Sequence, residues 1–232
     1  MNIKTLIEKA REYGQTLPPF TGGVEVKGNK IAGYLDSTLL KAEATLDQIQ
    51  SLCEEAVQNK FAAVCINPLY VSRVQRFLKG SEVKNCTVIG FPLGAILTPF
   101  KVEEAVQMVK EGAEEVDVVI PIGMLKSGNY QYVYKEITQV CEAAHKHNAL
   151  CKVILEMGLL TQDEKIIGCL LSQEAGADYV KTSTGMLAGG ATVEDVQLMR
   201  RVVGPEMVVK ASGGIRSWEE AKAMLKNGAT RL

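Results

Sequence analysis

The residues of this chain that could do chemistry are charged side chains set inside apolar, strand-like segments. They are Asp117, Lys152, Lys181 and Lys210. A charge in a buried strand is costly unless it is paired or can be neutralised. A desolvated lysine beside a second cation can lose enough basicity to attack a carbonyl carbon as an amine. Lys181 is the first candidate, because it follows the strand-favouring Tyr179 and Val180 and precedes the small residues 182–185.

The other charged residues fall on neighbouring predicted strands. Lys181 and Lys210 would repel each other on adjacent inner strands, an arrangement that lowers the pKa of an amine and that catalysis can use. Asp117 could balance the two lysines or move protons through a bound water. Lys152 and Glu156 lie four residues apart in one strand and could pair, so a structural ion-pair network explains them as well as catalysis does.

A second signal is the glycine pair Gly213-Gly214, which follows the segment that carries Lys210. Adjacent glycines before a helix let backbone N–H groups approach an anion. In (β/α)8 enzymes a phosphate commonly binds at the loops after strands seven and eight. After the first predicted strand, Asp36 and Thr38 could support such a site, and a helix N-cap is an equally good role for them.

The chain alternates between strand-like and helix-like segments. The predicted strands are 31–36, 61–67, 86–91, 115–121, 149–157, 178–183 and 207–212. The predicted helices between them are 45–59, 69–78, 101–111, 130–147, 161–174, 193–203 and 218–227. Thr45 and Thr161 have the composition of N-caps, and Gly112, Gly176 and Gly228 lie where helices end.

Short, almost wholly apolar strands indicate burial on both faces, as in a parallel sheet. The repeating units favour an α/β fold, a (β/α)8 TIM barrel, over a doubly wound sheet, because the first strand lacks the Gly-x-Gly-x-x-Gly turn of the latter. We expect one (β/α)8 domain over 1–232. An extra N-terminal helix and loop (1–30) could cover one end of the barrel. The eighth strand would begin at residues 229–232, where the given sequence ends. We therefore expect a truncated barrel with strand eight and its helix missing after 232, a partner that supplies the missing element, or a barrel with an open seam.

Composition narrows the possible partners. A net charge of −1 gives no electrostatic argument for nucleic acid or an anionic membrane, and no apolar run has the length of a membrane span. The six cysteines form no Cys-x-x-Cys pair and are typical of reduced core residues in a cytoplasmic protein. With two histidines, placed at a polar helix end, a catalytic metal is not expected, and Trp218 is expected to start the last helix and to have a packing role.

From residue 31 to 232 the chain resembles the deoxyribose-phosphate aldolases of the Schiff-base (class I) type. The resemblance rests on Leu35-Asp36-Ser37-Thr38-Leu39-Leu40, Cys65-Ile66-Asn67-Pro68, Gly90-Phe91-Pro92-Leu93-Gly94, Glu115-Val116-Asp117-Val118-Val119, Lys152-Val153-Ile154-Leu155-Glu156, Tyr179-Val180-Lys181-Thr182-Ser183-Thr184-Gly185 and Val209-Lys210-Ala211-Ser212-Gly213-Gly214-Ile215-Arg216. The last two motifs are highly specific together.

The resemblance implies that Lys181 forms the Schiff base, that Lys210 lowers the pKa of Lys181, and that Asp117 assists proton transfer. It implies reversible cleavage of 2-deoxy-D-ribose 5-phosphate to glyceraldehyde 3-phosphate and acetaldehyde, with no metal or organic cofactor, in a homodimer or tetramer. The substrate-binding residues expected on this basis are Asp36, Thr38, Cys65, Lys152, Thr182, Gly185, Gly213 and Gly214.

The chain departs from the family pattern at four places. Ser37, Met157 and Met186 stand where the family often has His, Thr and Phe or Lys, and the family continues after Ala-Thr-Arg with a Gly-Ser-Ser-type segment that helps to hold the phosphate. Two alternatives therefore remain. One is another phosphate-binding barrel enzyme, a keto-acid aldolase or a sugar-phosphate isomerase; the other is a truncated, inactive paralogue that binds sugar phosphate or assembles with full-length subunits.

Overall fold

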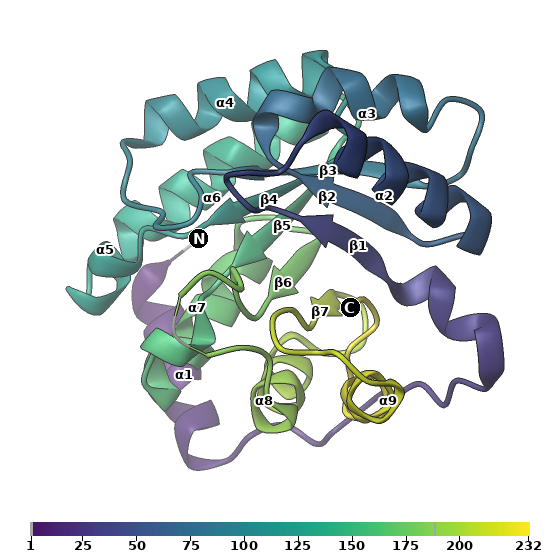
Figure 1. The fold of residues 1–232 in the computed structure, drawn as a ribbon. Coiled ribbons are helices and arrows are strands. Elements are labelled where there is room, and N and C mark those ends of the chain that lie inside the picture. The colour runs from purple at the N-terminus through teal and green to yellow at the C-terminus, as the bar shows by residue number, and fades with distance from the viewer. Residues whose placement is uncertain (1, 188) are drawn as a thin grey trace.

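The computed structural model describes residues 2–187 and 189–232 and shows a curled parallel sheet wrapped by helices (Figure 1). Seven strands follow one another in chain order: β1 (Asp36–Leu39), β2 (Ala63–Ile66), β3 (Lys84–Ile89), β4 (Glu115–Val119), β5 (Leu150–Ile154), β6 (Tyr179–Lys181) and β7 (Val208–Lys210). Every neighbouring pair is parallel. This order is the one that a (β/α)8 barrel requires, so the predicted fold class is confirmed.

The helices form the outer layer. They are α1 (Ile3–Gln15), α2 (Leu46–Asn59), α3 (Val71–Phe77), α4 (Thr98–Lys110), α5 (Ile122–Lys126), α6 (Tyr130–His145), α7 (Gln162–Glu174), α8 (Val193–Val203) and α9 (Trp218–Lys226). Shorter 3₁₀ helices cover Gly28–Tyr34, Pro68–Tyr70 and Met157–Leu159. None of the helices in residues 2–187 and 189–232 is long and apolar enough to cross a membrane.

Residues 230–232 join the two edges of the sheet. On the β7 side, the N–H of Thr230 donates to the Val209 carbonyl at 2.9 Å, and the N–H of Ala211 donates to the Arg231 carbonyl at 3.0 Å. On the β1 side, the N–H of Asp36 donates to the Leu232 carbonyl at 2.8 Å. The residues predicted to begin an eighth strand therefore lie in the eighth position and bridge β7 to β1.

The strands alternate between two buried faces. Outward residues such as Val116, Val118 and Val153 are fully buried against the helices. The inner face carries a small apolar cluster on β2 and β3, which includes Cys65 and Cys86, and charged residues on the remaining strands. This alternation explains why ionisable residues interrupt otherwise apolar segments, because they occupy every second position and point into the barrel.

Local signals at the helix ends were read correctly from the sequence. Thr45 and Thr161 both form capping boxes, in which the hydroxyl accepts from the N–H three residues on and that residue's side chain returns a bond. Gly112, Gly176 and Gly228 all have positive φ, at 109°, 84° and 107°. Such boundaries are fixed by local backbone geometry and so need no tertiary information.

The first predicted strand is wrong. Residues 28–34 form a 3₁₀ helix, and β1 begins only at Asp36. Ile31 and Tyr34 are apolar because they pack against the outer core, rather than because they belong to the sheet. The predicted strand 149–157 is also too long, since β5 ends at Ile154. Helix α5 was not predicted, because its five residues are too few to show a helical period.

Two smaller expectations fail in whole or in part. The N-terminal helix does not cover an end of the barrel, because α1 packs along α7 in the outer layer with Leu6 and Ala10 buried (Figure 1). The segment after it is held on the outside by Arg201, which donates to the carbonyl of Leu17 at 2.8 Å. Trp218 starts α9 as predicted, but it is 39% exposed, so its packing is only partial.

A buried ion pair joins α4 to α6 beneath the helix layer. Lys101 and Glu136 are both almost completely buried and hydrogen-bonded to each other. The ammonium also donates to the Val119 carbonyl at 2.8 Å, and the hydroxyl of Thr98 donates to the other carboxylate oxygen at 2.8 Å. All the polar atoms of the pair therefore have partners.

Replacing Glu136 with alanine should lower the free energy of unfolding by about 3–5 kcal/mol, because Lys101 would be left as an uncompensated buried charge. Urea unfolding followed by circular dichroism measures this loss. The matched control is the double variant Lys101→Met with Glu136→Leu, which removes both charges and should recover most of the loss. A single variant as stable as the parent would show that the pair is dispensable.

Candidate active site

Charged side chains from five strands meet inside the barrel. The register aligns Asp117 on β4 with Lys152 on β5, and Lys181 on β6 with Lys210 on β7. Asp36 enters from β1, next to the β7 edge across residues 230–232. Aligned positions on neighbouring parallel strands point to the same face, so the sheet brings together residues that are far apart in the chain.

Asp117 lies at the centre of this cluster. One carboxylate oxygen, Oδ1, accepts from Lys152 at 2.6 Å. The other, Oδ2, accepts from Lys181 at 2.6 Å and from Lys210 at 3.2 Å. Asp117 and Lys152 are fully buried, and Lys181 and Lys210 are at most 2% exposed. The predicted association of Asp117 with two lysines is therefore present, and Lys152 joins it.

The electrostatics keep most of this cluster charged. Burial alone would raise the pKa of Asp117, but Lys152, Lys181 and Lys210 outweigh it and hold that pKa well below the usual value. Burial alone would lower the pKa of Lys210, but Asp117 and Asp36 raise it above its usual value. The pKa of Lys152 is raised well above its usual value in the same way, chiefly by Asp117 against the effect of burial.

A second layer of charges lies deeper in the barrel. Asp36 accepts hydrogen bonds from both Lys210 and Arg231. One guanidinium nitrogen of Arg231 also donates to both carboxylate oxygens of Glu115, at 2.8 and 2.9 Å. The Lys152 ammonium lies 2.6 Å from the same carboxylate. Burial alone would raise the pKa of Asp36, but Lys210, Lys152 and Arg231 lower it. Four cationic side chains thus face three carboxylates.

Arg231 and Glu115 were not identified as site residues from the sequence. Arg231 follows the last predicted helix without any motif of its own, and Glu115 is one of several acidic residues around Asp117. The two carboxylates that Arg231 binds, Asp36 and Glu115, lie 195 and 116 residues before it in the chain. Only the closure of the sheet brings Arg231 beside Asp36 and Glu115.

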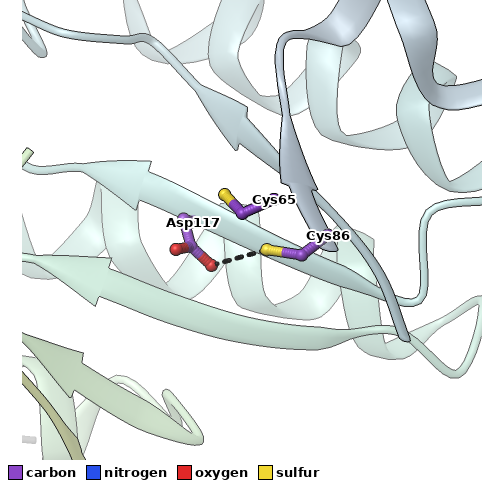
Figure 2. Close-up of side chains that lie close together, drawn as sticks. All are labelled: Cys65, Cys86 and Asp117. Atoms are coloured by element: carbon purple, nitrogen blue, oxygen red, sulfur yellow. Dashed lines mark hydrogen bonds between the residues drawn. The ribbon is translucent and has the colours of Figure 1, made fainter. Parts of the chain in front are cut away.

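Two thiols lie against Asp117, as Figure 2 shows. The thiol of Cys86 donates to Asp117 Oδ1 at 3.1 Å, and Cys65 lies on the neighbouring strand in register with Cys86. Thiolate and carboxylate groups within 4.8 Å of one another are possible metal ligands. However, both Asp117 oxygens already accept from ammonium groups, and Lys152 lies 3.0 Å from the Cys86 sulfur.

Protonation also opposes a metal at this position. Burial, and then the hydrogen bond with Cys65, raise the pKa of the Cys86 thiol well above its usual value. A metal ligand must be a thiolate, so binding would require proton loss from a thiol that holds its proton tightly. The residues as placed fit a network of thiols and ammonium groups better than a metal centre.

A cleft of about 460 Å³ opens above the lysines. Its floor includes Asp36, Lys181 and Lys210, and its wall includes Thr38. The rim is formed in part by Gly185, Gly213 and Gly214, with φ values of 77°, 85° and 81°. These left-handed conformations favour glycine and bring bare backbone to the edge of the cleft.

The rim presents backbone N–H groups to the cleft. Within the described residues, the N–H groups of Gly213 and Gly214 donate to no protein acceptor. Thr184, Met186, Lys41 and Ser212 also line the cleft, and none of them was named as a site residue from the sequence. Lys41 could not be found there, because it is one of many exposed lysines and belongs to no motif.

Three expected substrate-binding residues lie behind the cleft wall. Lys152 and Cys65 are fully buried among the inner charges and thiols. The Thr182 side chain is buried as well, and its hydroxyl oxygen accepts from the N–H of Ser212 at 3.0 Å. Contact of these three residues with a substrate stays a prediction.

Other expectations about side-chain roles need correction. Lys152 binds Asp117 and Glu115, and not Glu156, because the chain twists at Glu156 and turns its side chain toward the loop after β6. Asp36 and Thr38 lie within β1, not after it, and the N-cap of α2 is Thr45. His145 closes α6 at the surface, as expected, where it pairs with Asp178 at 2.8 Å.

A parallel barrel with buried lysines and a carboxylate below a glycine-rimmed cleft has the architecture of a (β/α)8 enzyme. A model of the DeoC/LacD family of aldolases matches residues 31–230, and the chain belongs to this family. Two relatives, both named deoxyribose-phosphate aldolase, come from Caldanaerobacter subterraneus subsp. tengcongensis and Thermococcus gammatolerans. The first is 57% identical over 203 residues (87% of this chain, 88% of the relative), and the second is 54% identical over 207 residues (88% and 92%).

Solved structures agree with these relatives. A putative deoxyribose-phosphate aldolase from Coccidioides immitis superposes with a TM-score of 0.93 at 41% identity, covering 100% of this chain and 93% of its own. The deoxyribose phosphate aldolase of Aeropyrum pernix, described as having a unique tetrameric structure, superposes with a TM-score of 0.84 at 31% identity, again over 100% and 93%. The family resemblance predicted from the motifs is therefore confirmed.

Proposed function

We propose that this chain reversibly cleaves 2-deoxy-D-ribose 5-phosphate to glyceraldehyde 3-phosphate and acetaldehyde through a Schiff base on Lys181. The observation that carries the proposal is the position of Lys181. It lines the cleft and contacts one carboxylate, Asp117, whereas Lys210 contacts two and Lys152 contacts three. The ammonium form of Lys181 is thus held by the fewest contacts of the three lysines. The names of the relatives supply the substrate.

The reaction follows from the chemistry of a neutral amine. Lys181 releases a proton, adds to the aldehyde carbon of the open-chain sugar, and loses water to form an iminium. Removal of the proton from the sugar hydroxyl lets the adjacent C–C bond break, and the iminium takes up the electron pair to become an enamine. Protonation of the enamine carbon and hydrolysis then release acetaldehyde and free the amine.

The surrounding charges support these steps. Asp117 remains a carboxylate because of its low pKa, so it can orient Lys181 and a reacting water, while Lys210 keeps its proton. The surplus of one cation over the carboxylates makes a neutral amine easier to accommodate in this cluster. An amine, a carboxylate and water suffice for these steps, so we propose a mechanism without a cofactor.

The proposed binding site for the substrate's phosphate is the glycine rim of the cleft. In this proposal the N–H groups of Gly213 and Gly214, which line the same cleft as Lys181, donate to the substrate's phosphate while its aldehyde end reaches Lys181. The tetramer of the Aeropyrum pernix protein supports a homo-oligomer for this chain as well. Size-exclusion chromatography with light scattering would distinguish a dimer or tetramer from a monomer.

The experiment that tests the function is a comparison of substrates. Purified chain is incubated with 2-deoxy-D-ribose 5-phosphate or with keto-deoxy sugar acids, and acetaldehyde and pyruvate are measured by coupled dehydrogenases. We expect acetaldehyde and glyceraldehyde 3-phosphate in equal amounts from the first substrate, and a rate unchanged by EDTA. Pyruvate from the second, or isomerisation without C–C cleavage, would contradict the proposal.

A further inference from the structure

Glu156 has a backbone conformation that glutamate seldom adopts. It lies in the left-handed region, with φ 55° and ψ 60°, directly after β5. The N–H of Leu155 on one side donates to the Lys181 carbonyl at 3.0 Å, and that of Met157 on the other donates to the Thr182 carbonyl at 2.9 Å. A strained residue persists when its surroundings determine it, and such residues cluster at functional sites.

The side chain of Glu156 is as unusual as its backbone. It is fully buried, and one oxygen, Oε2, accepts from the backbone N–H of Thr184 at 3.0 Å. The other oxygen, Oε1, has no hydrogen-bond partner in the described part of the chain. A buried carboxylate is costly when one of its oxygens lacks a hydrogen-bond partner, so we expect Glu156 to have a role that offsets this cost.

The loop after β6 is held from the opposite side by Ser212. The Ser212 hydroxyl donates to the Ser183 carbonyl at 2.6 Å, and its backbone N–H donates to the Thr182 hydroxyl at 3.0 Å. Farther along, the N–H of Ala191 donates to the Gly213 carbonyl at 3.0 Å. The segment that runs from Lys181 to the glycine rim is therefore clamped between Glu156 and the Ser212–Gly213 turn.

The clamp acts on the rim of the cleft more than on Lys181. Thr184 and Gly185 line the cleft next to Gly213 and Gly214. Lys181 is the last residue of β6 and is held by backbone pairing with β5 and β7. A Cβ on Gly213 would lie 3.5 Å from Gly185 Cα, so the two rim turns are in contact. Loss of the Thr184 anchor would displace the rim more than the lysine.

We propose that Glu156 is a positioning residue: through its bond to the Thr184 N–H it fixes the anion-binding rim and so sets the preference for phosphorylated over unphosphorylated substrates. The inference rests on the proposed function. Glu156 touches no reacting atom; it acts through Thr184 and Gly185. What it supplies is a hydrogen-bond acceptor at the correct reach, and not its charge.

Two conservative variants separate reach from charge. Glu156→Asp keeps the charge but shortens the side chain by one C–C bond, about 1.5 Å, and cannot span to the Thr184 N–H. Glu156→Gln keeps the reach and an acceptor oxygen but removes the charge. For 2-deoxy-D-ribose 5-phosphate we expect Glu156→Asp to raise KM about tenfold with kcat changed less than about threefold. Glu156→Gln should stay within about threefold of the parent in both.

The unphosphorylated sugar is the internal control. For 2-deoxy-D-ribose, both variants should keep kcat/KM within about threefold of the parent, because no phosphate contacts the rim. A purely structural role would reduce turnover of both sugars together and would overturn the proposal. So would a high KM in Glu156→Gln with a normal KM in Glu156→Asp, since that result would make the charge the important property.

Hydrogen exchange provides a readout that does not depend on activity. Peptides that cover residues 182–187 should exchange their amides about tenfold faster in Glu156→Asp than in the parent, and at the parent's rate in Glu156→Gln. Unchanged exchange in Glu156→Asp would overturn the anchoring itself. If the parent fails to cleave 2-deoxy-D-ribose 5-phosphate although the exchange result is as expected, the proposed function falls and the anchor stands.

Discussion

Replacing Lys181 with methionine should reduce turnover of 2-deoxy-D-ribose 5-phosphate by at least about 10³-fold, because the reaction then has no amine to form the iminium. Methionine has nearly the same length as lysine, so the cleft keeps its shape. Asp117 retains Lys152 and Lys210 as partners, at 2.6 and 3.2 Å, and the fold should survive. Steady-state kinetics, with circular dichroism to confirm folding, measure the effect.

The matched control is Lys84→Met, which removes an exposed lysine paired with Glu114 at 2.7 Å. This variant should keep the activity of the parent within about twofold, because surface ion pairs contribute little. If folded Lys181→Met kept full activity, another lysine or a mechanism without a Schiff base would have to be invoked. Lys210, on the same cleft floor, would be the next residue to replace.

Replacing Asp117 with asparagine should be the second most damaging change. It leaves Lys152, Lys181 and Lys210 facing one another without the carboxylate that both orients and neutralises them. Loss of a group that assists proton transfer typically costs about 10²–10⁴-fold in kcat. Removing one partner of a buried ionic cluster typically costs about 3–5 kcal/mol in the free energy of unfolding. Kinetics and urea unfolding measure the two effects separately.

The pH dependence of stability provides the control for Asp117. Its folded-state pKa is depressed below the ordinary value of 3.8, so its contribution is complete above that value and is lost as the pH falls through the folded pKa. Asp117→Asn lacks this titration and should lose less stability than the parent between about pH 4 and pH 2. If the free energy of unfolding fell equally in the two proteins over this pH range, the assigned ion pairs would be contradicted.

Much of the site could be predicted because strand periodicity is local. Asp117, Lys181 and Lys210 were recognisable as charges in apolar strands, and a parallel sheet in chain order places such residues on one inner face. The glycines of the rim could be found for a similar reason. Gly185, Gly213 and Gly214 lie in the loops that follow β6 and β7, and their left-handed backbone is what a close-approach turn requires.

The remaining features depend on closure and on strain, which a local pattern does not encode. Arg231 acquires its role because residues 230–232 bridge β7 to β1, and Asp36 lies beside Lys210 for the same reason. The start of β1 was misplaced, since the apolar residues before it pack outside the barrel. Glu156 was assigned to Lys152 on the period of a regular strand, but its left-handed backbone turns the side chain toward Thr184.

The most direct test of the account is to trap the covalent intermediate. Purified chain is treated with acetaldehyde and sodium borohydride, digested, and analysed by peptide mass spectrometry. We predict one reduced two-carbon adduct, on Lys181, which blocks the proposed nucleophile irreversibly and abolishes turnover in proportion to labelling. Folded protein that carries no adduct on Lys181, or carries it on Lys210 or Lys152 instead, would contradict the assignment of Lys181 as the Schiff-base lysine.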